Sequence, residues 1–177
     1  MTMRDIATAI KRVESVLHKR PQAGLQDDAP ATSRWEGNAR VLSRHPSGLH
    51  VVTDMPKELG GTGDQVTPGW LMRAALASCA TTGIVMAAAK QDIALRSLEV
   101  VACSQSDARG MLGMTDITGA SVPAGPTAVE LRVSICAPGV SDARLQALVK
   151  ACSLCAPVSC AMESAVPVTL RIDVLAA

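Results

Sequence analysis

One long run of small apolar residues constrains the fold of this chain more than any other feature. It begins at Thr67-Pro68, where the threonine can cap a helix and the proline suits the first helical turn, and it extends to Gln91. Its most apolar part, residues 74–89, is too short and too rich in Ser and Thr to predict a membrane span. The run therefore predicts a helix at the centre of a globular domain.

The composition shows what must pack around that helix. Apolar residues make up 48% of the chain, yet there is no Phe, no Tyr and only two Trp. Small side chains fill a core only if backbones approach closely or if a second chain completes the core, so we expect an oligomer. The net charge is +1 without a long basic block, so we expect no binding to nucleic acid or to a membrane surface.

The other elements are predicted from their periodicity and from turn residues. Apolar residues recur at helical spacing over 6–19, and a polar linker follows to residue 32, so the chain divides into an N-terminal helix with linker (1–32) and one domain (33–177). In that domain the sequence predicts strands over 33–43, 49–53, 97–106, 128–137 and 166–174, and a further helix over 141–155. This order predicts an α+β domain whose sheets pack on two central helices.

The N-terminus and the cysteines indicate the compartment. The first residues, MTMRD, have neither the apolar segment nor the cleavage site of a signal peptide. Six cysteines in a chain of this length do not imply a disulfide framework. We therefore expect a cytoplasmic protein whose thiols are mostly reduced.

Four segments, in the right order, resemble one known family. The segment PKELGGTGDQVTPGWLMRAALASC, residues 56–79, resembles the osmotically-inducible-protein-C/organic-hydroperoxide-resistance (OsmC/Ohr) family, in which a Gly-rich loop and a Pro precede the helix with the reactive cysteine. The segment over 89–100 resembles the family's helix exit and next strand, DARGMLGM over 107–114 resembles a stretch of one branch, and APVSCAMESAVPVTLRI over 156–172 resembles the second-cysteine region and the last strand. The similarity extends over roughly residues 35–174.

This resemblance implies both an architecture and an activity. The implied fold has curved antiparallel sheets packed around two central helices, in an intertwined homodimer whose sites are lined by both chains. The implied activity is a thiol peroxidase that reduces organic hydroperoxides with electrons from a dithiol, without a cofactor. A thiolate attacks the O–O bond and becomes a sulfenic acid, which a second thiol then captures.

Cys79 stands at the family's reactive position. It lies about ten residues inside the predicted helix, so the helix dipole is too distant to activate it, and Arg73 faces another side of the helix. The resemblance implies an activating Arg on the early hairpin, where Arg40 is the best match and Arg44 the next. The alternative is that Cys79 is an inert core residue, because free cysteine is often buried.

The second thiol has three candidates, Cys152, Cys155 and Cys160. Many catalytic members of the family carry a cysteine directly before a Pro in this region, whereas here Ala156 occupies that position. We choose Cys155, one residue earlier, as the resolving thiol. The alternative is that all three cysteines are packing residues at a helix end.

One departure from the family separates two functions. Hydroperoxide-reducing members carry a Glu directly after the Pro that opens the central helix, where it holds the Arg; here Gly69 and then Trp70 follow Pro68. Glu58 or Asp64 on the preceding loop can replace that carboxylate. Trp70 can instead line an apolar pocket, although a lone Trp is more often a core or interface residue. The leading hypothesis is therefore a peroxidase, and the alternative is a non-catalytic dimer that binds an apolar small molecule at its interface.

Other site classes lack their motifs. Cys152-x-x-Cys155 has no second cysteine pair and no His pair at ligand spacing, so we expect no metal. The loop GGTG lacks the Lys-Ser/Thr of a phosphate loop, and no Ser-His-Asp signature is visible.

Overall fold

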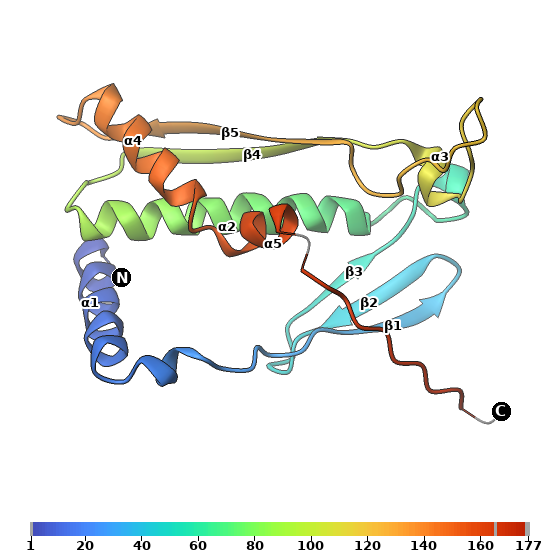
Figure 1. Cartoon of the computed structure of the whole chain (residues 1–177), viewed down its shortest axis with the longest axis horizontal. Helices are drawn as coiled ribbons and strands as arrows, with labels where there is room; N and C mark the ends of the chain where they lie inside the picture. The colour runs from blue at the N-terminus through green and yellow to red at the C-terminus, as the bar shows by residue number, and fades with distance from the viewer. Residues whose placement is uncertain (1, 165, 176–177) are drawn as a thin grey trace.

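The computed structural model describes residues 2–164 and 166–175 and shows a mixed α+β chain (Figure 1). Its elements are α1 (Met3–Lys19), the 3-10 helix η1 (Pro21–Gly24), β1 (Thr32–Gly37), β2 (Arg40–Arg44), β3 (His50–Thr53), the 3-10 helix η2 (Lys57–Leu59), α2 (Pro68–Lys90), β4 (Ser97–Gln105), α3 (Ala108–Met111), β5 (Ala128–Cys136), α4 (Asp142–Ser153) and α5 (Pro157–Glu163). The α+β prediction is confirmed.

The long helix α2 lies at the centre of the molecule, as its sequence predicts. Thr67 caps it by accepting a hydrogen bond from the Trp70 amide at 3.2 Å, and Pro68 occupies the first turn. By length and composition alone α2 is able to cross a membrane. In this chain, however, it packs against α1, α4, α5 and β4, which is how the core helix of a globular domain is packed.

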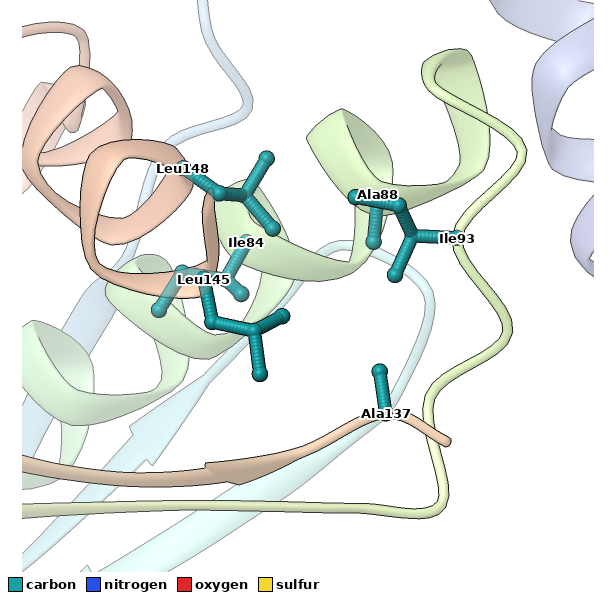
Figure 2. Close-up of a cluster of buried hydrophobic side chains, with 6 residues drawn as sticks. All are labelled: Ile84, Ala88, Ile93, Ala137, Leu145 and Leu148. Atoms are coloured by element: carbon teal, nitrogen blue, oxygen red, sulfur yellow. The ribbon is translucent and has the colours of Figure 1, made fainter. Parts of the chain in front are cut away.

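The buried core is small and lies at one end of α2. Its six side chains join α2, the connection to β4, the end of β5 and α4 (Figure 2): Ile84, Ala88, Ile93, Ala137, Leu145 and Leu148. Because α4 contributes two leucines to this cluster, the core fixes α4 against α2. It thereby sets the position of the cysteines that follow in the sequence.

Two separate antiparallel sheets flank the helices. The order β1-β2-β3 forms one sheet, and β4 pairs with β5 to form the other, which runs along α2 (Figure 1). The single strand predicted over 33–43 is wrong in one respect, because a turn interrupts it. Gly37 (φ 104°) and Asn38 (φ 48°) adopt left-handed conformations there, and the chain reverses between β1 and β2.

Two further predictions are corrected at the C-terminal end. The predicted strand over 166–174 is wrong for the isolated chain: the segment pairs with no described strand, and its apolar side chains are mostly exposed. A strand needs a neighbouring edge to receive its hydrogen bonds, and the chain folds without bringing one there. The helix predicted over 141–155 ends earlier, at Ser153, and Pro157 opens a separate short helix, α5.

Candidate functional site

An apolar groove between α2 and the α4–α5 segment contains three of the six free cysteines. Its volume is about 630 Å³, within the range of small-molecule sites. Its lining residues are Ser78, Cys79, Thr82, Gly83, Met86, Ala87, Lys90, Gln91, Leu148, Ala151, Cys152, Cys155, Ala156 and Pro157. The groove therefore joins reactive groups to a surface suited to an apolar ligand.

The helix register brings Cys155 toward Cys79. The helix α4 runs back along α2 in the opposite direction (Figure 1), and the Cys152 thiol donates to the carbonyl oxygen of Gly83 at 3.7 Å. Gly83 lies one helical turn after Cys79 on α2. Cys155 lies three residues beyond Cys152, in the direction of Cys79. Cys79 on α2 and Cys155 after α4 therefore line the same groove.

The thiols near α4 have different surroundings. Cys155 is exposed and lies in the turn between α4 and α5, whereas Cys152 is half-buried. Burial raises the pKa of the Cys152 thiol, and the neighbouring Cys155 raises it further, so Cys152 is protonated at neutral pH. Cys160 is directed to the carbonyl oxygen of Leu154 at 3.6 Å and does not line the groove.

Arg40, at the start of β2, belongs to a polar network on the Gly-rich loop. Its guanidinium donates to the Thr62 hydroxyl at 3.0 Å, forms an ion pair with Asp64, and lies 3.6 Å from the Asp54 carboxylate. Asp64 was one of two candidates for the missing carboxylate, and it does hold Arg40. Sequence reasoning missed Asp54, because its partners Thr62 and Arg40 come from the loop and from another strand, and no local pattern marks such a pairing.

Asp54 is the buried centre of this network, with 1% of its surface exposed. It accepts hydrogen bonds from the Thr62 hydroxyl, from the Thr62 amide at 2.9 Å and from the Met55 amide at 2.7 Å. These bonds, and the charge of Arg40, lower the pKa of Asp54 to about 2. The loop closes tightly around Asp54: a Cβ on Gly61 would lie 1.8 Å from the Met55 carbonyl oxygen.

The groove brings together only part of the predicted site. Cys79 and Cys155 line it, while Arg40 and Trp70 do not, and Trp70 is half-exposed on the first turn of α2. Arg73 donates to the Ser104 hydroxyl of β4 at 3.2 Å, which confirms that it faces away from Cys79. Among the described residues that line the groove, Lys90 is the one basic side chain, three turns from Cys79 and paired with Glu14. Within the described part of the chain, the lining of the groove thus places no basic side chain next to Cys79.

Comparison with known proteins identifies the family. The OsmC-like protein family matches residues 61–171, which is more than half of the chain. The chain belongs to the OsmC-like family. No curated protein matches the sequence. This OsmC-like chain is also similar to solved structures, whose identities are low enough that they establish the fold alone.

Three solved structures illustrate that similarity. An OsmC-like protein from Mycoplasma pneumoniae has a TM-score of 0.64 at 14% identity, covering 78% of this chain and 89% of that one. An organic hydroperoxide resistance protein from Elizabethkingia anophelis has a TM-score of 0.59 at 23% identity, and the match covers 78% of this chain and 89% of that one. The organic hydroperoxide resistance protein OsmC from Legionella pneumophila has a TM-score of 0.54 at 23% identity, and the match covers 78% of this chain and 90% of that one.

Proposed function

We propose that this OsmC-like protein is a thiol peroxidase that reduces organic hydroperoxides. The observation that carries the proposal is that Cys79 and Cys155 line one apolar groove. The Cys79 thiolate attacks the outer oxygen of the O–O bond, the alcohol leaves, and Cys79 becomes a sulfenic acid. Cys155 then condenses with that sulfenic acid, which releases water and forms a disulfide. A dithiol reduces the disulfide and closes the cycle.

The groove supplies specificity for the apolar part of the substrate. Met86, Ala87 and Leu148 line its wall beyond the thiols, and its volume of about 630 Å³ accommodates an aromatic or alkyl group. A hydroperoxide that lays this group along the wall has its peroxide end near Cys79. We place the enzyme in the reducing cytoplasm, where six free thiols persist.

A cation is still needed to favour the thiolate and to stabilise the leaving alkoxide. We assign this role to Arg40, supplied by a second chain, because Arg40 belongs to the loop network and not to the groove of its own chain. Asp54 and Asp64 would hold the guanidinium in place of the Glu that the family carries after Pro68. Each site of the proposed homodimer then combines thiols from one chain with Arg40 of the partner subunit.

The exposed surface of the single chain supports a large interface. It exposes 13359 Å², whereas a compact monomer of 18.3 kDa exposes about 8,100 Å². Residues 166–174 add an extended segment with alternating apolar residues and no partner strand in the described chain, 60% to 95% exposed: Val166, Val168, Leu170, Ile172 and Val174. In the proposed dimer this segment would become a strand on a sheet edge, and its alternating apolar side chains would be buried.

A second candidate function is supported by the loop itself. Arg40 already has three acceptor groups there, and Gly69 stands where the family carries Glu. In this alternative the protein is a non-catalytic dimer, and the same apolar groove binds a small molecule at the interface. Native mass spectrometry of freshly purified protein would then detect a co-purifying apolar ligand.

Mapping the cysteines after one equivalent of cumene hydroperoxide distinguishes the two functions. A peroxidase forms a Cys79–Cys155 disulfide within seconds, and the Cys79→Ser variant consumes hydroperoxide no faster than buffer. Cys136→Ser, which changes an exposed cysteine at the end of β5, is the control and should retain full activity. Equal consumption by wild type and Cys79→Ser would reject the peroxidase and leave the binding protein.

A further inference from the structure

Cys152 is a third thiol of the groove that the proposed cycle does not use. It lines the groove together with Cys79 and Cys155, and its thiol donates to the carbonyl oxygen of Gly83 at 3.7 Å. Cys152 is half-buried and lies at the same end of α4 as the proposed resolving thiol, Cys155. The question is therefore whether these two thiols can form a disulfide with each other.

The backbone already brings Cys152 and Cys155 within disulfide range. The Cys155 amide donates to the Cys152 carbonyl oxygen at 3.1 Å, which closes a turn of four residues at the end of α4. Such a turn brings its first and fourth Cα atoms within about 7 Å. A disulfide needs Cα atoms about 4.4–6.8 Å apart, so the bond requires a side-chain rotation and little backbone movement.

We propose that Cys152 is a relay thiol that transfers the disulfide from Cys79 to the Cys152–Cys155 pair before the external dithiol acts. This inference rests on the proposed peroxidase function. The Cys152 thiol loses its proton to solvent, and its thiolate attacks the Cys155 sulfur. The new Cys152–Cys155 bond forms as the Cys79–Cys155 bond breaks, and Cys79 leaves as a thiolate. No further oxidant is consumed, and Cys79 is ready for a second hydroperoxide.

The surroundings of the two sulfurs favour this direction of exchange. Burial raises the pKa of the Cys152 thiol, so its thiolate, once formed, is a strong nucleophile toward the Cys155 sulfur. The resulting disulfide includes the exposed Cys155, where a dithiol reductant can reach it. Because Cys152 must first lose its proton, the relay step should become faster as the pH rises.

Trypsin separates the two disulfides cleanly. It cuts after Arg73 and Lys90, which isolates Cys79. It also cuts after Lys150 and Arg171, which leaves Cys152, Cys155 and Cys160 together on one peptide. A Cys79–Cys155 bond joins the two peptides, whereas a Cys152–Cys155 bond is a loop within one. After one equivalent of cumene hydroperoxide, the cross-linked pair should appear first and then decay into the looped peptide with a free Cys79.

Two variants and a stoichiometry test this transfer. Without reductant, wild type should reduce about two equivalents of cumene hydroperoxide per chain, and Cys152→Ser about one, with a persistent Cys79–Cys155 cross-link. Cys160→Ser is on the same peptide but outside the groove, and it should match wild type. A stable cross-link in wild type would overturn the relay and leave the peroxidase. A direct Cys79–Cys152 bond would also overturn the relay, because Cys152 would then be the resolving thiol.

A separate titration keeps the relay testable if the peroxidase fails. The Cys79→Ser variant is equilibrated with mixtures of oxidised and reduced dithiothreitol, and the looped peptide is quantified. The relay requires the Cys152–Cys155 bond to form here without Cys79. Failure of this bond to form under oxidising mixtures rejects the relay, whatever the outcome with hydroperoxide.

Discussion

The thiol groove and the Arg40 loop differ in nearly every physical respect. The groove is apolar, and its cysteines have few polar partners. In the loop, by contrast, the Asp54 carboxylate is buried and accepts three hydrogen bonds, and Arg40 is bound by two carboxylates and a hydroxyl. The groove provides room for a ligand, whereas the loop provides a fixed charge.

The contrast is the reason for proposing that two chains complete the site. A thiol peroxidase needs a cation beside its thiolate, yet the chain holds its best-organised cation on a different structural unit. A guanidinium held by carboxylates is preorganised, so it can meet a groove on a second chain without further ordering. In the proposed dimer the loop and the groove would be two halves of one site, each built where the local sequence can support it.

Removing the charge should have the largest effect on activity. Arg40→Met is expected to lower kcat/KM for cumene hydroperoxide by about 10²–10³, which is typical of the loss of one preorganised donor. Steady-state kinetics with a dithiol reductant measure this loss. Arg34→Met, which changes the exposed ion pair with Glu36, is the matched control and should leave kcat/KM unchanged.

Arg40→Lys distinguishes charge from shape. The lysine keeps the charge but cannot bind two carboxylates in the same planar geometry, so we expect partial activity between wild type and Arg40→Met. Full activity in Arg40→Met would mean that the groove does not need Arg40, and the proposal that the loop and the groove form one site would be wrong.

Filling the tight turn of the loop should have the next largest effect. In Gly61→Ala the new methyl group would meet the Met55 carbonyl oxygen, so the backbone around Asp54 must move. We expect the free energy of unfolding to fall by about 1–3 kcal/mol, measured by urea denaturation. Gly125→Ala, whose methyl group would meet no atom within 4 Å, is the control. Equal stability of the two variants would show that the loop is not closely packed.

The sequence predicted the groove better than the loop. The small-residue run, its Thr67 cap and Cys79 are local signals, so α2 and its thiol could be placed without a structure. The pairing of Arg40 with Asp54 joins residues from different strands through a loop, and no local period reveals it. The segment 166–174 was predicted as a strand from its alternation, but a strand also needs an edge, and this chain alone does not provide it.

Substitutions of Gly83 test whether the substrate binds in the groove, and we expect smaller changes in stability and KM from them. A Cβ at this position meets no atom within 4 Å, so Gly83→Ala should stabilise α2 by about 0.5–1 kcal/mol. Gly83→Leu should instead obstruct the groove and raise KM for cumene hydroperoxide more than for hydrogen peroxide. Ala75→Leu, at an exposed position of α2 outside the groove, is the control and should leave KM unchanged for both peroxides. An unchanged KM in Gly83→Leu would place the substrate elsewhere.

The smallest effect is expected at low pH. The folded-state pKa of Asp54 is about 2, below its ordinary value of 3.8, so folding favours the carboxylate. Its contribution to stability is complete above pH 3.8 and is lost as the pH falls through about 2. Urea denaturation over this range should show a steeper loss in wild type than in Asp54→Asn. Asp27→Asn, in the exposed linker, should retain the wild-type slope.

Complementation between two inactive variants tests the shared site most directly. Arg40→Met and Cys79→Ser proteins are unfolded together, refolded as a mixture and assayed with cumene hydroperoxide. In a random mixture half of the dimers carry one of each chain, and one of their two sites has both native groups, so activity should recover to about a quarter of wild type. If the mixture stays as inactive as its components, Arg40 and Cys79 do not act across two chains, and the two-halves account is wrong.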